Sequence, residues 1–317
     1  MGIMAQREAF GTALLEYGSH APNVVVLDAD TSSSTLSKYF AEAFPERFYN
    51  VGIAEPCLVD VAVGLALGGF TPFINAFSAL LSLRALEQIR TCVSYANVNV
   101  KIAAGYAGLS DYKDGPTHHS LIDIGIMRML PGMTVIVPAD EHEIKAWVPV
   151  IAEHQGPVFL RLSRSGSESV HPTIPEVEIG KGFQLRHGSD VSIITAGLMV
   201  ARSLRAAEAL LKEGIQAGVI EMSSIKPIDE SLILQAAHQT GALVTAEEHS
   251  IIGGLGSAVA EVVTAHHPVP VERVGVHDVF ARTGPDPDTL MDAFGLSVED
   301  ICKACRKVIH RKGNAGG

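Results

Sequence analysis

Short segments rich in valine and isoleucine alternate with longer helical patterns along this chain, and this order constrains the fold more than any other feature. The segments that predict β-strands lie at residues 23–27, 71–75, 98–103, 134–137, 158–162, 191–195, 217–221, 243–246 and 271–274. Because few polar residues alternate with the apolar ones, we expect strands buried on both faces, as in a parallel sheet. The predicted helices lie at 35–43, 55–67, 80–95, 121–129, 141–154, 200–212, 230–239, 255–266 and 298–310. This βαβ order predicts an α/β fold with doubly wound sheets.

A segment without apolar periodicity, residues 163–182, divides the pattern into two parts. It is rich in serine, proline, glycine and glutamate, which is typical of a linker. A chain of 317 residues, 47% of them hydrophobic, is long enough to form two domain cores. We therefore expect two doubly wound domains, at residues 1–170 and 183–317.

Charge and hydropathy exclude several classes of protein. The formal net charge is −11 and no Lys/Arg run is interleaved with aromatics, so we expect no nucleic-acid partner. Residues 61–83 carry no charge and are long enough to span a bilayer, but glycines at 68–69 and Pro72 divide them into a predicted buried helix and a buried strand. Residues 1–8 lack the pattern of a signal peptide. We expect a cytoplasmic protein without a membrane partner.

The four cysteines do not indicate a disulfide framework in a chain of this length. Cys302 and Cys305 have a spacing found in redox and metal sites. However, they share the period of a helix face with Ile301 and Val308, and no second pair lies at zinc spacing. We predict core packing for both cysteines and no metal site formed by this chain.

Two short motifs point to chemistry. In the first, Glu55 begins an apolar helical pattern and no further charged residue occurs before Asp60. A carboxyl group in apolar surroundings can hold or share a proton near neutral pH. In the second, a Gly-Pro turn separates Asp114 from His118 in a predicted loop, where catalytic side chains often lie. Taken singly, each motif is equally compatible with an ordinary helix start or turn.

Together and in this order, the motifs 50–55 (NVGIAE) and 114–118 (DGPTH) resemble the C-terminal half of transketolase. The resemblance runs from about Arg7 to about Ile309. Its other anchors are 72–77 (PFINAF), 130–140 (LPGMTVIVPAD), 225–229 (IKPID) and 246–256 (AEEHSIIGGLG). It implies a pyrimidine-binding domain followed by a transketolase C-terminal domain.

The resemblance implies a role for each matching residue. Glu55 would bond to the ring nitrogen of the aminopyrimidine of thiamine diphosphate, and Phe77 would stack on that ring. Leu80 stands where the family has a second aromatic residue. His118 would bond to oxygens of the donor sugar and assist proton transfer. Asp114 would contact a hydroxyl group of the acceptor.

The resemblance also implies an anion site. The residues at the family's phosphate-binding positions are Arg7, Ser32 and Arg164, although a solvated surface role is equally compatible with each. Tyr106 replaces a family histidine beside the substrate funnel, and Tyr112 and Lys113 replace a Gly-Glu pair. The sugar pair therefore stays open, and a modified or sulfonated sugar is one option.

The chain lacks the Gly-Asp-Gly…Asn-Asn signature with which transketolases bind the diphosphate through a metal ion. The resemblance therefore implies a partner subunit that holds the diphosphate and Mg²⁺ or Ca²⁺, in an α2β2 assembly. We expect the C-terminal subunit of a split transketolase, moving a two-carbon ketol unit from a phosphate- or sulfonate-bearing ketose to an aldehyde.

Three alternatives remain. Two are related enzymes: a 1-deoxyxylulose-phosphate synthase-like half and a 2-oxo acid dehydrogenase beta subunit, which the motif at 114–118 fits poorly. The third is a non-catalytic assembly partner, which would have no use for Glu55 together with His118.

Overall fold

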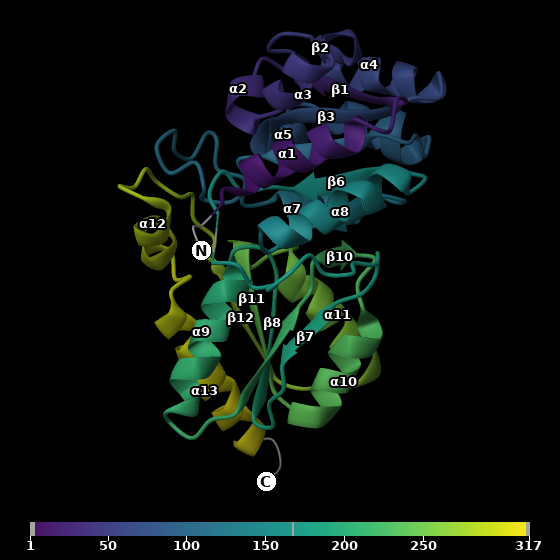
Figure 1. Ribbon diagram of the computed structural model, residues 1–317. Helices are drawn as coiled ribbons and strands as arrows, with labels where there is room; N and C mark the ends of the chain where they lie inside the picture. The colour runs from purple at the N-terminus through teal and green to yellow at the C-terminus, as the bar shows by residue number, and fades with distance from the viewer. Residues whose placement is uncertain (1–3, 167, 315–317) are drawn as a thin grey trace.

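The computed structural model describes residues 4–166 and 168–314, so both outer ends of the expected domains lie outside the described residues. The chain forms two α/β units, one above the other in Figure 1. The strands of the first unit are β1 (Val24–Asp28), β2 (Phe48–Asn50), β3 (Thr71–Phe77), β4 (Lys101–Gly105), β5 (Thr134–Ile136) and β6 (Val158–Arg161). Its helices are α1 (Gln6–Gly18), α2 (Ser32–Thr35), α3 (Lys38–Ala43), η1 (Pro45–Arg47), α4 (Glu55–Leu67), α5 (Ser78–Leu83), α6 (Leu86–Gln88), the π-helix η2 (Ile89–Tyr95), α7 (Asp123–Met129) and α8 (Glu141–Glu153).

The first sheet has the order β10-β5-β6-β4-β3-β1-β2, in which β1 to β6 pair in parallel. Strands β1, β3, β4, β5 and β6 bury both faces, as their apolar composition predicts, whereas the edge strand β2 is partly exposed. Along β1, Val24 and Val26 pack with helices α1 and α8, while Val25 and Leu27 pack with α4 and η2 on the other face. Helices therefore cover both sides of the sheet.

The second unit has a five-stranded sheet in the order β12-β11-β8-β9-β7. Its strands are β7 (Phe183–Arg186), β8 (Val191–Thr195), β9 (Ala217–Glu221), β11 (Leu243–Ser250) and β12 (Val271–Val276). Its helices are α9 (Met199–Leu211), α10 (Glu230–Thr240), α11 (Leu255–His266), α12 (Pro287–Ala293) and α13 (Val298–Asn314). Helices α9 and α13 cover one side of the sheet, and α10 and α11 cover the other (Figure 1).

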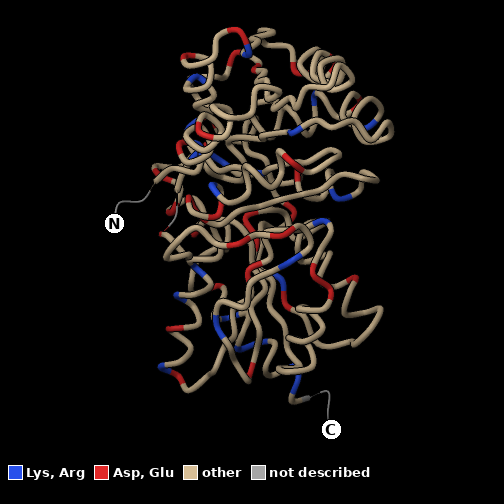
Figure 2. The backbone as a smooth tube through the Cα atoms, turned by 45° about the vertical axis from the view of Figure 1, so that its right-hand side comes forward, with Lys and Arg blue, Asp and Glu red and all other residues tan. Residues whose placement is uncertain are grey.

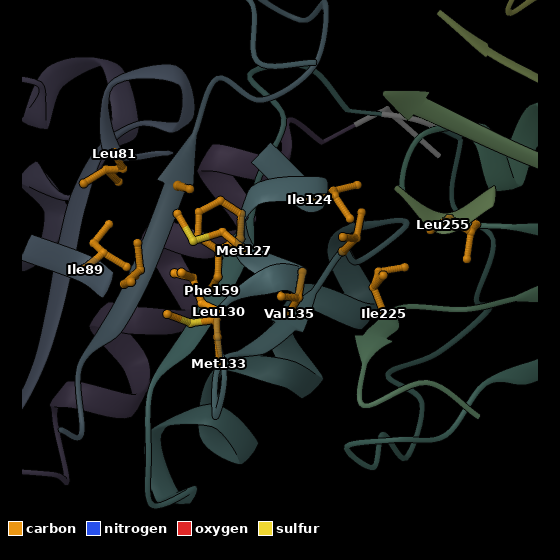
Figure 3. Packing of buried hydrophobic residues seen from close by; sticks show 14 of the residues in the cluster. Leu81, Ile89, Ile124, Met127, Leu130, Met133, Val135, Phe159, Ile225 and Leu255 are labelled. Atoms are coloured by element: carbon orange, nitrogen blue, oxygen red, sulfur yellow. The ribbon is translucent and has the colours of Figure 1, made fainter. Parts of the chain in front are cut away.

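The two units share structure at their junction. Strand β10 (Ser224–Lys226) follows β9 of the second unit, yet it pairs antiparallel with β5 at the edge of the first sheet. One apolar cluster continues from Leu81 and Phe159 in the first unit to Ile225 and Leu255 in the second (Figure 3). The junction is therefore packed as a protein core.

The predicted α/β fold is confirmed, and β8, β9, α4 and α11 have their predicted bounds. Cys302 and Cys305 are buried free thiols in the core, as predicted. Strands β7 and β10 were not predicted, and each pairs antiparallel at the edge of an otherwise parallel sheet. Helix α1 was not predicted, although Phe10 and Leu14 have helical spacing and are buried.

Two predicted helices are interrupted. The helix expected at 35–43 breaks at Leu36, whose φ of +63° is left-handed, giving α2 and α3. The helix expected at 80–95 breaks after α5. There the N–H of Ala85 bonds five residues back to the carbonyl of Leu80 at 3.2 Å, out of α-helical register.

Acidic and basic residues are interspersed along both units, without a long continuous basic stretch (Figure 2). Within residues 4–166 and 168–314, no helix combines the length and the apolar character that crossing a membrane requires.

Candidate active site

The predicted site residues lie where the parallel strands of the first sheet end. Strands β1, β3, β4 and β6 are close neighbours in this sheet. Ligands of open α/β sheets bind outside the carboxyl ends of the strands, where the connecting loops meet. Each loop or strand end here contributes one predicted residue: Ser32 after β1, Phe77 ending β3, Tyr106 after β4 and Arg164 after β6.

Glu55 is the first residue of α4, where its charge complements the helix dipole and Pro56 suits the first turn. The side chain is only 1% exposed. Its Oε2 accepts a hydrogen bond from Nη1 of Arg84 at 2.8 Å, whereas the Arg84 side chain is 49% exposed. The prediction of purely apolar surroundings is therefore wrong, because a guanidinium covers the carboxylate.

Three rings meet beside the end of β3. The Phe77 ring centroid lies 4.4 Å from that of Tyr106 and 5.8 Å from that of His118, which it meets edge-on. Phe77 and Leu80 are both half-buried, Leu80 on the first turn of α5. The structure thus brings residues from β3, the loop after β4 and the 114–118 turn into one aromatic group.

Tyr106 also joins two predicted anion-binding residues. The guanidinium carbons of Arg7 and Arg164 lie 5.8 and 5.4 Å from its ring centroid, and Nη1 of Arg7 donates to its hydroxyl at 2.9 Å. Tyr106 has a left-handed φ of +59°, a strained backbone state that is frequent at functional sites. Two arginines at one tyrosine form a local positive field that suits an anionic group.

Asp111 counters part of this field. It is buried, and its Oδ1 accepts from Nη1 of Arg164 at 3.1 Å. The pKa of Asp111 is raised to about 6. Burial is the main cause, and the neighbouring carboxyl group of Asp114 is the second. Asp114 itself is exposed at the surface of the loop. The loop therefore combines an exposed carboxyl group, which interacts with Asp111, and a buried one that restrains Arg164.

The second unit shapes this loop. Gly115 has a φ of +81°, and a Cβ there would lie 2.9 Å from Cγ2 of Thr283. The N–H of Gly284 donates to the carbonyl of Tyr112 at 3.0 Å. The loop between β4 and α7 thus takes its form from contacts with the segment before α12.

The two adjacent histidines point to different surroundings. His118 is half-buried, faces Phe77 and has Nδ1 3.0 Å from the Thr117 hydroxyl. His119 is buried, and its Nε2 lies 3.0 Å from the carbonyl of Asp111. Burial lowers the pKa of His119. Among this pair, only His118 adjoins the aromatic group.

Ser32 begins α2 and is half-buried. Ser34 in the same short helix accepts a hydrogen bond from Nη1 of Arg7 at 3.0 Å through its carbonyl, so the segment adjoins the arginine pair. Asp28 holds this segment, because its buried carboxylate accepts from the hydroxyls of Thr35 and Ser37 and from the N–H of Thr31. Burial raises the pKa of Asp28.

Two of the residues present have the chemistry that binding an aminopyrimidine requires. A buried carboxylate, Glu55, suits a hydrogen bond to a ring nitrogen, and the half-buried ring of Phe77 suits stacking. The described residues include one cluster with metal-ligating geometry, Glu143, His171 and Glu221, which contains none of the predicted site residues.

Sequence reasoning missed Asp28, Asp111 and Arg84. An acid that directly follows an apolar strand, such as Asp28, was a usable signal. Asp111 lies three residues before Asp114 and was passed over. The contact of Arg84 had no sequence signal, because it depends on the turn after α5.

The transketolase pyrimidine-binding domain model matches residues 3–168, and the transketolase C-terminal domain model matches 180–301. The 6-deoxy-6-sulfo-D-fructose transketolase subunit of a Clostridium species is 42% identical over 96% of this chain and 95% of its own length. A structure described as a split gene transketolase, inactive beta4 tetramer, is 48% identical, with a TM-score of 0.91 over 98% of this chain and 100% of that one.

A 1-deoxy-D-xylulose-5-phosphate synthase of Geobacter sulfurreducens is 38% identical over 98% of this chain, which spans 49% of that protein. The synthases are thus related enzymes of about twice the length. The shorter relatives match from end to end, and members of their family use thiamine diphosphate. The chain therefore belongs to the transketolase family, as a C-terminal subunit of the split kind.

Proposed function

We propose that this chain, with an N-terminal partner subunit, transfers a two-carbon ketol unit from a ketose with a terminal phosphate or sulfonate to an aldehyde. The observation that carries the choice of an anionic sugar is the pair of arginines at Tyr106, next to the aromatic group. A relative of this chain is named for a sulfonated sugar. Arginine forks bind the oxygens of either anion.

We assign the coenzyme side of the site to Glu55, Phe77 and Leu80. Thiamine diphosphate supplies the carbanion that accepts the two-carbon unit. Glu55 would hold the proton of the aminopyrimidine ring nitrogen, and its burial would strengthen that hydrogen bond. Phe77 would stack on the ring, with Leu80 as a non-aromatic second wall.

We assign the substrate side of the site to the loops at the carboxyl ends of the strands of the first sheet. His118 would bond to the donor sugar's oxygens and move a proton there, because an imidazole ring can both donate and accept a hydrogen bond. Asp114, exposed on its loop, would contact a hydroxyl of the acceptor. The anion would lie among the residues of the remaining set: Arg7, Ser32, Tyr106 and Arg164.

The assembly we propose is an α2β2 heterotetramer in which this chain supplies domains at 1–170 and 183–317. The partner would bind the diphosphate through Mg²⁺ or Ca²⁺. We expect the purified chain alone to bind thiamine diphosphate weakly and to show no turnover. Ketol transfer by this chain without a second polypeptide would contradict the shared-site proposal.

Glu55→Ala in the reconstituted complex tests the coenzyme side. We expect the rate of ketol transfer to fall by about 10²–10⁴-fold, while binding between the subunits is preserved. Subunit binding is measured by gel filtration. A variant that keeps more than about a tenth of wild-type turnover would show that Glu55 is structural.

Arg164→Ala tests the substrate side. We expect the KM for anionic ketoses to rise by about 10–100-fold, since a charge-assisted hydrogen bond is worth roughly 1.5–3 kcal/mol, and the KM for neutral ketoses to change little. An equal loss with both kinds of ketose would exclude Arg164 from the anion site. Pyruvate decarboxylation faster than ketol transfer would instead favour the synthase or dehydrogenase activity.

A further inference from the structure

A buried cluster at the junction of the two units takes no part in the proposed reaction. It consists of Glu143 on the first turn of α8, His171 in the segment between the units and Glu221 at the end of β9. One ligand atom from each residue can be chosen so that all three lie within 4.8 Å of one another. Glu143 and Glu221 have no exposed surface, and His171 is 6% exposed.

The surrounding hydrogen bonds hold these side chains in place. The two carboxylate oxygens of Glu143 accept from Nε1 of Trp147 at 2.9 Å and from the N–H of Ala139 at 2.6 Å. Oδ2 of Asp140 accepts from the N–H of His171 at 2.8 Å and so fixes its backbone. Metal ligands in proteins are oriented by outer hydrogen bonds of this kind.

The two glutamates of the cluster have no lysine or arginine partner among the described residues. Nε2 of His171 lies 2.8 Å from Oε2 of Glu221. The other oxygen, Glu221 Oε1, is buried without a hydrogen-bond partner among the described groups.

We propose that Glu143, His171 and Glu221 form a structural site for one divalent transition-metal ion of the zinc class. One imidazole and two carboxylates suit Zn²⁺, Mn²⁺ or Co²⁺ better than Ca²⁺ or Mg²⁺, which prefer oxygen ligands alone. A divalent ion neutralises both carboxylates. Bonds of about 2.0–2.2 Å separate tetrahedral ligand atoms by roughly 3.3–3.6 Å, so an ion that bound Nε2 of His171 and Oε2 of Glu221 would move these two atoms apart from their present 2.8 Å.

Such an ion would join three segments that are far apart in the sequence: the start of α8, the connecting segment and the end of β9. No sequence motif indicates the cluster, because its residues lie 28 and 50 positions apart (171−143 and 221−171). This site would revise the expectation that the chain binds no metal, and it is independent of the ion that the partner subunit would hold.

The test is metal binding by the whole chain after removal of metals with a chelator. Titration with Zn²⁺ and with Co²⁺, followed by calorimetry, should give one tight site per chain, and Co²⁺ should develop the visible absorption of a ligated ion. Thermal unfolding should shift to higher temperature. Glu221→Gln and His171→Gln should each weaken the site by more than about 100-fold.

Two variants serve as controls. Glu141→Gln changes a buried carboxylate on the same helical turn but outside the cluster. His267→Ala removes a surface pair in which the rings of His238 and His267 lie 3.9 Å apart and could bind ions. Neither should alter the tight site.

If the wild-type chain bound neither Zn²⁺ nor Co²⁺ in a one-to-one ratio, the proposal would be overturned. The close approach of Glu143 and Glu221 would then be explained by a proton that the two carboxyl groups share. Unchanged binding by Glu221→Gln, or loss of the site in His267→Ala, would also overturn it. The wild-type titration decides the question even if a variant fails to fold.

Discussion

The pair formed by Glu55 and Arg84 makes a quantitative prediction about stability. Arg84→Met should destabilise the chain, because it leaves a carboxylate with 1% exposure without its cation. Removing one partner of a fully buried pair costs roughly 3–5 kcal/mol, whereas an exposed pair contributes about 0.2–1 kcal/mol. Because the Arg84 side chain is 49% exposed, we expect a loss between these limits, about 1–3 kcal/mol.

The assay is a double-mutant cycle on the chain without its partner, using urea denaturation of wild type, Arg84→Met, Glu55→Gln and the double variant. Arg84→Met should cost much less when residue 55 is glutamine, since no buried charge is then left without its cation. The coupling between the two positions should therefore be about 1 kcal/mol or more.

Arg90 and Glu87 provide the matched control. Their ion-pair distance is also 2.8 Å, but their side chains are 58% and 65% exposed. The same cycle there should give a coupling of at most about 0.5 kcal/mol. If the coupling energy of Glu55 and Arg84 were no larger than that of Glu87 and Arg90, burial of Glu55 would not strengthen its ion pair. That result would refute the prediction.

Two further outcomes follow from contacts described above, and a third follows from the carboxyl group of Glu248, which is buried near the end of β11. Tyr106→Phe removes the hydroxyl that Arg7 contacts at 2.9 Å. The KM for an anionic ketose should therefore rise about 3–10-fold, while kcat stays within about twofold of wild type. A fall in kcat of about 100-fold would instead assign Tyr106 to catalysis. Gly115→Ala should lower the free energy of unfolding by about 1–2 kcal/mol. Adding Thr283→Ser should restore part of this loss, because it removes the methyl group that lies 2.9 Å from the new Cβ. If the double variant were no more stable than Gly115→Ala, this clash would be excluded. Burial raises the pKa of Glu248 from 4.5 to about 7, so its native carboxyl binds a proton that the unfolded chain releases, and stability falls as pH rises. Between pH 6 and 8 the free energy of unfolding of the wild type should therefore fall by about 1.4 kcal/mol relative to that of Glu248→Gln. Urea denaturation measures both values, and an equal change with pH in the two proteins would contradict a raised pKa for Glu248.

Local patterns predicted much of the fold and part of the site. The start of α4 at Glu55 was predictable, because an acid and a proline next to it are favourable in a first helical turn. Strands β8 and β9 were predictable, because strands buried on both faces are mostly apolar. These signals are carried by neighbouring residues alone.

The remaining features depend on distant parts of the chain. Strand β10 spans only Ser224–Lys226, and its pairing with β5 cannot be read from three residues. The grouping of Arg7 with Arg164 around Tyr106 depends on helix α1 meeting the ends of β4 and β6. For this reason the sequence indicated the anion site residue by residue and placed Tyr106 beside the substrate, but it did not indicate that this tyrosine joins the two arginines.

The position of β10 has a consequence for dissecting this protein. A fragment that ends in the segment 163–182 would leave the edge of β5 unpaired and would uncover the apolar cluster around Ile225. Unpaired strand edges promote aggregation. The first unit is therefore unsuited to separate expression at that boundary. A fragment meant to isolate it should carry the antiparallel strand 224–226 on a designed connection, or should mask the edge with charged residues on β5.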